Sequence, residues 1–401
     1  MLTESLLVAT TRTPLDNVDT PSISLVNLHT GATSTTLKRS HTAARGLAAT
    51  PHHLFAQQSD KSVVNVYSTA TWALQTTVPF PEPFTVLAAS PCGAFLAGGT
   101  AGGRVYMWEL ASGRFVASPP IHLQTVTTLA WSRGSTHVIA GSEDTNVSVW
   151  SVVALLDSRA PGRAPERVLQ RHIGAVTAVV AGRAGSAGPS EIVVSAGRDR
   201  SVVVWELHTG VALRRFLVAG TPVSLALDPV ERAVYVGLEE GGVQVVELLG
   251  GAESSLVWDE KARDVPVTVE SPVWGADSGS AALSLAVGYE GNVLVVGNAR
   301  GEVGVWDVAT GCLFKNLCQL KGIPSRKMAC LEDLLTPDSS IDVPYPPPAD
   351  RLHAFSNGYT ADDRTPHPSE TPLRIHPRSC VDATFRPKHV HAVALAPYGH
   401  G

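Results

Sequence analysis

The chain has 401 residues, of which 44% are apolar and 17% charged, with a formal charge of −5 at pH 7. This apolar content suffices for a packed core and excludes a wholly disordered chain, while the acidic balance argues against a broad nucleic-acid-binding face. The 35 glycines and 28 prolines indicate short strands and turns rather than long exposed helices. A chain of this length can still form one all-β domain.

The number of cysteines and the length of the apolar runs indicate the cellular environment in which the protein works. The chain has five cysteines, an odd and sparse set that does not suit a disulfide framework, so we expect a reducing environment. The short apolar run near the N-terminus has no basic segment before it, and no stretch approaches the roughly 18 apolar residues of a membrane span. We therefore expect a soluble intracellular protein.

A strand-like phrase with alternating apolar residues recurs seven times along the chain. Its clear copies are VYMWEL, VSVWSV, VVVWEL and VGVWDV, and its weaker copies are ISLVNL, VNVYST and VQVVEL. The equivalent positions are 26, 67, 108, 150, 205, 246 and 306, so that successive gaps are 41, 41, 42, 55, 41 and 60 residues. The four gaps near 41 have the period of a four-stranded propeller blade, and the two long gaps equal one blade plus an insertion.

The other elements keep the same order in each copy. Two apolar strands joined by a turn precede the recurring strand, and a fourth strand follows it after a Thr-Gly or Ser-Gly turn, with β-branched residues dominating throughout. Those turns are Thr30-Gly31, Ser112-Gly113, Thr209-Gly210 and Thr310-Gly311. The pattern resembles the WD-repeat β-propeller family over residues 1–317, and the resemblance implies an all-β, seven-bladed propeller.

Two copies match the family's structural tetrad, in which hydrogen bonds link His, Ser or Thr, Asp and Trp across a blade. The matching residues are His122, Ser142, Asp144 and Trp150 in the fourth copy, and His172, Asp199 and Trp205 in the fifth, where Gly197 replaces the serine. In such a set the Asp caps a turn, the His relays to it, and the indole N–H finds a buried acceptor. We therefore interpret the Asp–His–Ser combination as structural and not as a catalytic triad.

The first copy lacks a leading strand, because ESLLVATT at residues 4–11 aligns with the second strands of other copies. A closed ring needs that strand from elsewhere in the chain. The C-terminal HAVALAPYGHG is similar to VLAASPCGAFL in the third copy. We therefore predict that residues 390–396 close the first blade, within a C-terminal segment 390–401.

Two insertions interrupt the repeats and carry candidate contact residues. The first, at about 154–171 with the Gly/Ala-rich run 181–191, holds Arg159, Arg163, Arg167 and Arg171 at four-residue spacing. Prolines 161 and 165 argue against a helical basic stripe, which leaves either a solvated loop or a contact for RNA phosphate or an acidic partner. The second insertion, 250–280, holds Trp258 and Trp274, which are candidate contacts for a partner or RNA. Trp258 would be either a core residue of a fourth strand or an exposed anchor for a partner.

Residues 318–389 leave the repeat and are rich in proline. A basic segment, KGIPSRK, lies at 321–327, and its charged residues Lys321, Arg326 and Lys327 are further candidates for partner or RNA contact. Composition of this kind cannot form a core of its own, so we predict an irregular excursion along the rim that docks partners.

The sequence lacks the motifs that are typical of catalytic and metal sites. It contains no P-loop, no His-Glu-x-x-His, no CxxC pairs for zinc and no complete nucleophile elbow. We therefore expect no enzyme activity, no catalytic residues, no metal and no cofactor. A closed propeller with rigid loops favours a protein-interaction scaffold.

Three longer segments resemble one particular group within the WD-repeat family. The segments at 29–68, 81–116 and 224–243 resemble the pre-rRNA-processing WD-repeat proteins of the Ipi family, which are similar to the animal WD-repeat protein eighteen. The resemblance implies a scaffold subunit of the Rix complex in the nucleolus and nucleoplasm. This subunit acts on pre-60S particles with Rix and Ipi proteins, supports spacer removal and recruits the midasin ATPase. It also implies a homodimer within the complex, although the C-terminal helix that relatives use for self-association is not recognisable here.

A substrate receptor of a cullin ubiquitin ligase is the main alternative, followed by a signalling or mRNA-processing scaffold. Such receptors typically carry Trp-Asp-x-Arg at the end of a third strand. Here Trp306-Asp307 is followed by Val308 and Ala309, and the segments after Trp150 and Trp205 also lack the arginine. The missing arginine argues against a function as a cullin-ligase receptor.

Overall fold

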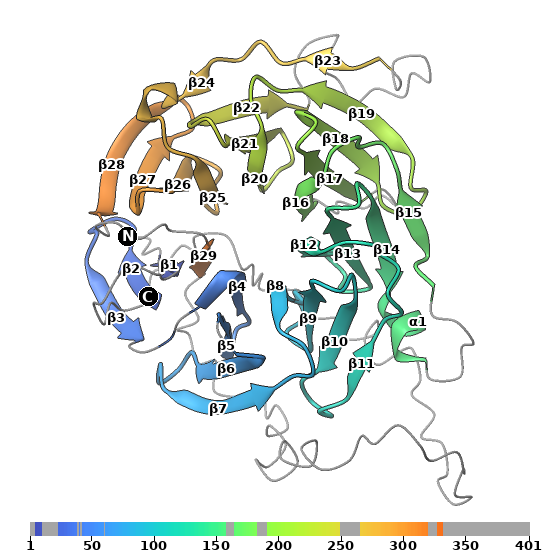
Figure 1. Ribbon diagram of the computed structural model, residues 1–401. Coiled ribbons are helices and arrows are strands. Elements are labelled where there is room, and N and C mark those ends of the chain that lie inside the picture. The colour runs from blue at the N-terminus through green and yellow to red at the C-terminus, as the bar shows by residue number, and fades with distance from the viewer. Residues whose placement is uncertain are drawn as a thin grey trace, which may run out of the picture.

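The computed structural model describes residues 5–9, 23–37, 40, 42–59, 61–157, 164–182, 191–248, 265–319 and 327–331. In these residues seven sheets, each with four antiparallel strands, stand around a common axis as the blades of a β-propeller (Figure 1). The seven-bladed, all-β fold predicted from the repeat is therefore confirmed. No helix of the described part is long and apolar enough to cross a membrane.

In blades two to seven the strand that comes first in the chain lies nearest the axis, and in blade one the inner strand is β29. Blade one contains β29 (Lys327–Leu331), β1 (Ser5–Ala9), β2 (Ile23–Asn27) and β3 (Thr33–Leu37); blade two contains β4 (Thr42–Ala49), β5 (His53–Gln58), β6 (Val63–Ser68) and β7 (Leu74–Pro79). Blade three contains β8 (Phe84–Ala89), β9 (Phe95–Thr100), β10 (Val105–Glu109) and β11 (Phe115–Ala117). Blade four contains β12 (Val126–Trp131), β13 (His137–Ser142), β14 (Val147–Ser151) and β15 (Arg167–Leu169), with the short helix α1 (Val152–Leu156) after β14.

The remaining blades include one addition. Blade five contains β16 (Val176–Ala181), β17 (Ile192–Gly197), β18 (Ser201–Glu206), β19 (Ala212–Leu217) and a fifth strand, β23 (Val267–Thr268). Blade six contains β20 (Pro222–Leu227), β21 (Ala233–Leu238), β22 (Val243–Glu247) and β24 (Val273–Trp274); blade seven contains β25 (Ala282–Val287), β26 (Val293–Asn298), β27 (Glu302–Asp307) and β28 (Cys312–Gln319).

The core of the described ring lies between the blades. Its buried apolar residues form seven clusters, and each cluster joins two neighbouring blades. In β18, for example, Val202 and Val204 pack toward blade six, while Val203 and Trp205 pack toward blade four. This division follows from the two-residue period of a strand, which sends alternate side chains to opposite faces of the sheet. A blade therefore buries both faces only when it has a neighbour on each side.

A strand from beyond the seventh blade closes the ring. β29 pairs antiparallel with β1, so that Ser5 faces Leu331 and Ala9 faces Lys327. The sequence had predicted closure by residues 390–396, which lie outside the described residues. The structure gives the inner edge of blade one to residues 327–331, taken from the segment that we expected to lie on the rim. Backbone hydrogen bonds hold such an edge strand, and these place few demands on side-chain sequence.

Hydrogen bonds between inner strands reinforce the ring. The inner strands of blades three to seven each bulge at their second residue. The bulge hydroxyl of Thr85 donates to the carbonyl of Val126 on the next blade at 2.6 Å, and the bulge hydroxyl of Thr127 donates to the carbonyl of Val176 at 2.6 Å. A bulged residue has no ladder partner, so its polar groups are available for such contacts.

Arg45 crosses the central channel. It lies at φ 57° in the irregular part of β4, and its guanidinium donates to the carbonyl of Thr127 at 2.7 Å and to that of Val223 at 3.1 Å. Both acceptors are bulge residues, on blades four and six. A single side chain therefore ties three inner strands that are far apart in sequence.

The second insertion forms a strap along the outside of blades five and six. From β23, which lies parallel to β19, the chain passes to β24, the outer strand of blade six. Buried Gln244 fixes the strap, because its amide donates to the carbonyls of Val269 and Ser271, both at 3.1 Å, and accepts the N–H of Ala219 at 2.8 Å.

We expect a chain ending at residue 340, which keeps β29, to unfold at the same urea concentration as the full chain. A chain ending at residue 326 should lose about 3–5 kcal/mol of unfolding free energy, because five ladder pairs of blade one are removed. Equilibrium urea unfolding followed by tryptophan fluorescence measures both. If the chain ending at residue 340 were as unstable as the chain ending at residue 326, the result would indicate that residues 390–396, and not β29, close the first blade.

Candidate functional site

Four side chains of blade five, Trp205, Ser195, His172 and Asp199, form a continuous series of hydrogen bonds, here called a strut. The indole N–H of Trp205 donates to the hydroxyl of Ser195 at 2.8 Å, and that hydroxyl lies 2.8 Å from His172 Nε2. His172 Nδ1 lies 3.3 Å from an oxygen of Asp199. His172 Nδ1 also lies 3.1 Å from the hydroxyl of Ser201, which itself donates to Asp199 at 2.7 Å. With the ring proton on Nδ1, directed at these two acceptors, Nε2 accepts the hydroxyl of Ser195, and the oxygen of Ser195 accepts the indole N–H. The indole N–H, the serine hydroxyl and both imidazole nitrogens of this strut are thereby paired.

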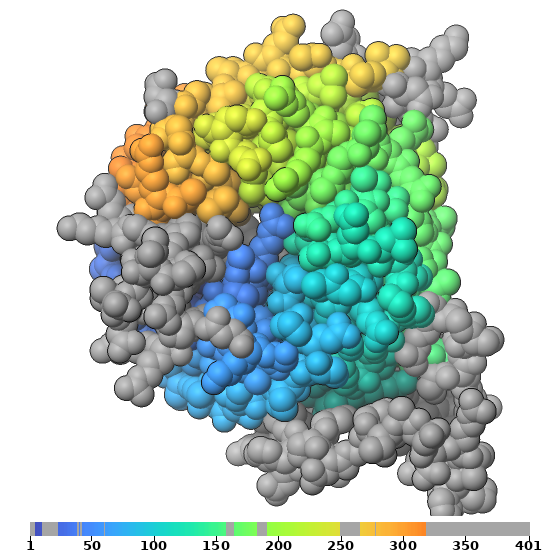
Figure 2. Space-filling view, viewed as in Figure 1, coloured from blue at the N-terminus to red at the C-terminus, as the bar shows by residue number. Residues whose placement is uncertain are grey.

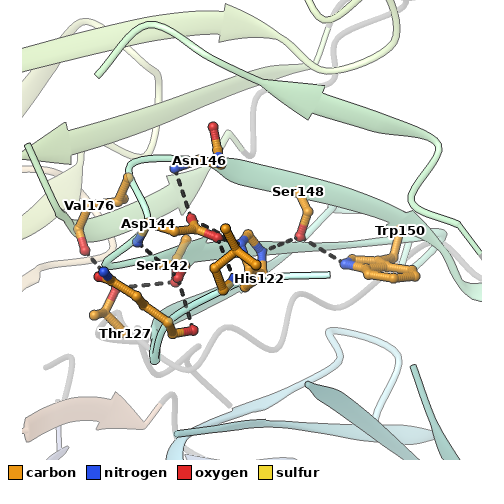
Figure 3. A network of polar contacts seen from close by, with 11 residues as sticks. His122, Thr127, Ser142, Asp144, Asn146, Ser148, Trp150 and Val176 are labelled. Atoms are coloured by element: carbon orange, nitrogen blue, oxygen red, sulfur yellow. Dashed lines mark hydrogen bonds and ion pairs between the residues drawn. The ribbon is translucent and has the colours of Figure 1, made fainter. Parts of the chain in front are cut away.

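Blade four contains an equivalent strut with a different serine (Figure 3). His122 Nδ1 lies 2.9 Å from Asp144 Oδ2, His122 Nε2 lies 2.7 Å from the hydroxyl of Ser148, and the Trp150 indole donates to the same hydroxyl at 2.9 Å. The His, Asp and Trp chosen from the sequence therefore come together in both blades.

The expected serine positions were wrong. Ser142 lies outside the relay, where its hydroxyl donates to the carbonyl of Gln124 at 3.2 Å and accepts the N–H of Asp144 at 3.2 Å. In blade five the serine is not replaced by Gly197, since Ser195 supplies it. A Cβ at Gly197 would lie 2.7 Å from His172 Nδ1, so glycine leaves room for the ring.

The two serines occupy opposite members of one cross-strand pair. In blade five Ser195 on β17 faces Val203 on β18, whereas in blade four Ala140 on β13 faces Ser148 on β14. Because directly paired residues project on the same side of a sheet, either can deliver a hydroxyl to the same point. A serine ten residues before the tryptophan would have identified the relay in blade five, but the sequence gives no comparable signal in blade four.

The struts are buried, which affects the acid–base properties of the aspartate. Burial alone would raise the pKa of Asp199, but hydrogen bonds from His172, the N–H of Ile173 and the hydroxyl of Ser201 outweigh it and hold the pKa well below its usual range. The His122, His172, Asp144 and Asp199 side chains are all nine-tenths or more buried. This geometry braces a turn and presents no group to a substrate.

Each strut also holds one exposed loop residue. Asp144 Oδ2, which also faces His122, accepts the backbone N–H of Leu123 at 3.0 Å. In Asp199 the oxygen that does not face His172 accepts the backbone N–H of Ile173 at 3.0 Å. Their side chains point away from the protein, with 92% of Leu123 and 80% of Ile173 exposed. The struts therefore build a surface on blades four and five with two fixed apolar side chains.

Blade six fixes the corresponding loop without a histidine. Glu240 takes the position of the aspartate and accepts the N–H of Thr221 at 2.8 Å and its hydroxyl at 3.1 Å. As in blades four and five the carboxylate bonds the loop directly, but Val246 stands in blade six where those blades have the tryptophan. Three neighbouring blades therefore anchor their loops to a carboxylate.

The other candidate contact residues lie apart from one another. Arg167 is half-buried on β15, 3.8 Å from Glu166, and Arg171 is exposed beside His172. Lys327 begins β29. Trp274 is half-buried on β24 and packs against Tyr235 between blades six and seven, which makes it a core residue and not an exposed anchor. Arg159, Arg163, Trp258, Lys321 and Arg326 lie outside the described residues.

Comparison with known proteins identifies the family. A model for "WD domain, G-beta repeat" matches residues 113–151. The chain is 30% identical over 312 residues to "Pre-rRNA-processing protein IPI3" of Yarrowia lipolytica, a match that covers 73% of this chain and 70% of that one. The chain belongs to the Ipi family of WD-repeat proteins.

Other Ipi-family relatives extend the match. "Pre-rRNA-processing protein crb3/ipi3" of Schizosaccharomyces pombe is 26% identical, over 80% of this chain and 76% of its own. Human "WD repeat-containing protein 18" is 29% identical, over 70% of this chain and 63% of its own. Among solved structures, "Structure of U3-55K" gives a TM-score of 0.53 at 20% identity, covering 69% of this chain and 81% of that one, which supports the fold alone.

Moving the serine across blade four should be nearly neutral. Ser148→Val alone should lower the unfolding free energy by about 1–3 kcal/mol, because it leaves the buried His122 and Trp150 nitrogens without a partner. Ala140→Ser combined with Ser148→Val copies the arrangement of blade five and should recover most of that loss in urea unfolding. If the double variant were no more stable than Ser148→Val, the positions would not be interchangeable.

The Asp199 strut should make stability depend on pH in the acid range. A carboxyl whose pKa is lower in the folded state stabilises the protein fully above its unfolded pKa of about 3.9, and this contribution falls as pH drops toward the folded pKa. The difference in unfolding free energy between the unaltered chain and Asp199→Asn should therefore be constant from pH 7 to 5 and smaller at pH 3. A constant difference down to pH 3 would contradict this account.

Proposed function

We propose that this chain is a non-catalytic scaffold subunit of a nuclear complex that matures the precursor of the large ribosomal subunit. Its family membership carries the proposal, because the matched relatives are named as pre-rRNA-processing proteins and the match runs over most of the propeller. In this proposal the chain works in the nucleolus and nucleoplasm with the Rix and Ipi proteins on pre-60S particles. There it supports spacer removal and recruitment of the midasin ATPase.

The physical properties of the propeller suit a scaffold. Loops held by buried struts keep their shape before binding, so little conformational entropy is lost when a partner docks. The His, Asp and Ser side chains that resemble a catalytic set are hydrogen-bonded to one another in the struts of blades four and five. Assembly of partners is the role that such a rigid framework supports best.

Electrostatics favour protein contacts over broad RNA contact. The formal charge of −5 would oppose extended binding to a polyanion, so the main attachment to a ribosomal precursor would be through proteins. Local RNA contact by basic residues is compatible with this arrangement. We therefore expect binding of the purified chain to bare pre-rRNA to be weak and strongly salt-dependent.

Complementation in fission yeast tests the proposed function. The chain is expressed in cells depleted of their own crb3/ipi3 protein, and northern blots with a probe for the second internal transcribed spacer measure the unprocessed precursors. We expect the full chain to reduce their accumulation, while the chain ending at residue 326 should not, because it lacks β29.

Purification of a tagged copy of the chain from the same cells identifies its partners. Recovery of large-subunit assembly factors agrees with the proposal. Failure to restore processing, together with recovery of cullin adaptors, would contradict it and favour a ubiquitin-ligase receptor.

A further inference from the structure

Leu123 and Ile173 are the two most exposed large apolar side chains in the described residues. Each follows the histidine of a strut and lies three residues before the first residue of an inner strand, β12 or β16. These strands are neighbours, joined by the hydrogen bond from Thr127 to Val176. Two equivalent aliphatic side chains therefore project from adjacent blades.

The protein holds these side chains in place. A flexible loop could turn an apolar residue inward, but the backbone N–H groups of Leu123 and Ile173 are bonded to the buried strut carboxylates. Exposure of such side chains to water is unfavourable, and a partner that covers them gains that free energy with little loss of loop entropy. The arrangement is typical of anchor positions in an interface.

Basic residues surround Ile173. Exposed Arg171 lies two residues before it in the sequence. Exposed Arg198 lies on a turn next to this loop, and its backbone N–H donates to the carbonyl of Ala175 at 2.9 Å. Arg200 is exposed two residues further along the same turn, where its charge also interacts with Glu240 of blade six. The nearby strut carboxylate of Asp199 is already engaged by His172 and Ile173. The blade-five side of this surface is therefore rich in cationic groups.

The blade-four side differs in charge. The N–H of Glu143 donates to the carbonyl of Thr125 at 3.0 Å, which is the contact that Arg198 makes in blade five. An exposed acidic residue thus stands beside Leu123 at the position of an arginine beside Ile173. In blade six Glu239 takes the same position, so the arginine turn is flanked by acidic turns. This polarity would orient a bound segment.

We propose that Leu123, Ile173, Arg171, Arg198 and Arg200, here named the blade 4–5 patch, bind an acidic peptide segment of a protein partner. The segment would place apolar side chains on Leu123 and Ile173 and carboxylates beside the arginines. This inference rests on the proposed scaffold function and specifies one of its docking surfaces.

The composition of the blade 4–5 patch favours a peptide over RNA. Single-stranded nucleic acid is usually bound by basic residues together with aromatic side chains on which bases stack. The patch offers aliphatic anchors, which contribute by burial against other apolar groups and provide no stacking surface. Arginine also pairs well with carboxylates through two parallel hydrogen bonds.

Peptide selection on the full-length chain tests the blade 4–5 patch. Random 12-residue peptides displayed on phage are selected on the immobilised protein, and the recovered sequences are synthesised with fluorescein for anisotropy titration. We expect sequences that combine leucine, isoleucine or phenylalanine with aspartate or glutamate. The double variant Leu123→Ser/Ile173→Ser should weaken their binding by about tenfold or more, and Arg198→Glu should weaken it and reduce its salt dependence.

Matched controls lie elsewhere on the ring. Val230→Ser removes an apolar side chain that is 61% exposed on a turn of blade six, and Arg300→Glu reverses an exposed charge on blade seven. Neither should change peptide affinity by more than about twofold. Urea unfolding of each variant confirms that the ring is intact.

Three results would overturn the proposal: recovery of no acidic, apolar sequences; equal binding by Leu123→Ser/Ile173→Ser; or binding of a fluorescein-labelled 12-nucleotide oligouridine that is lost in this double variant. The outcome is separable from that of the yeast experiment. A chain that restores pre-rRNA processing but selects no such peptide keeps its scaffold role and loses this docking surface. A chain that binds the peptides but does not restore processing loses the ribosomal assignment alone.

Discussion

Packing between blades is the constraint on which the rest of this structure depends. The described apolar clusters each span two neighbouring blades, and the strands divide their side chains between the two sides. No blade can satisfy both of its faces alone, so stability requires a closed circle. Figure 1 shows β29 completing blade one, and Figure 2 shows the coloured blades packed side by side around the ring. The closing strand β29, the bulge hydrogen bonds and Arg45 at the centre all act on that requirement, because each connects segments that are distant in sequence.

Polar struts add a second level of order to this apolar framework. In blades four and five the same sequence of indole, hydroxyl, imidazole and carboxylate is built with the serine on different strands. What the fold requires is a hydroxyl at one point in space, bonded on both sides, because an unpaired buried donor or acceptor is costly. The equivalence of Ser148 and Ser195 is therefore a property of the sheet and not of any motif.

The struts connect stability to function. Their carboxylates hold the backbone of the loops on one surface, and in blades four and five those loops expose Leu123 and Ile173. Chemical groups that resemble a catalytic set thus hold the backbone of exposed loops. The His and Asp side chains of both struts are nine-tenths or more buried, and their hydrogen bonds serve to fix the loops.

The sequence by itself determined the number of blades, their order and the position of the recurring strand in each, because these depend on a local periodicity that every copy repeats. Only the tertiary structure decided which segment closes the ring, which serine completes the blade-four strut, and that Trp274 belongs to the core between blades six and seven. Each of these depends on a neighbour in space. An edge strand is selected by backbone pairing, and a cross-strand partner or an arginine reaching 82 and 178 residues along the chain leaves no periodic trace.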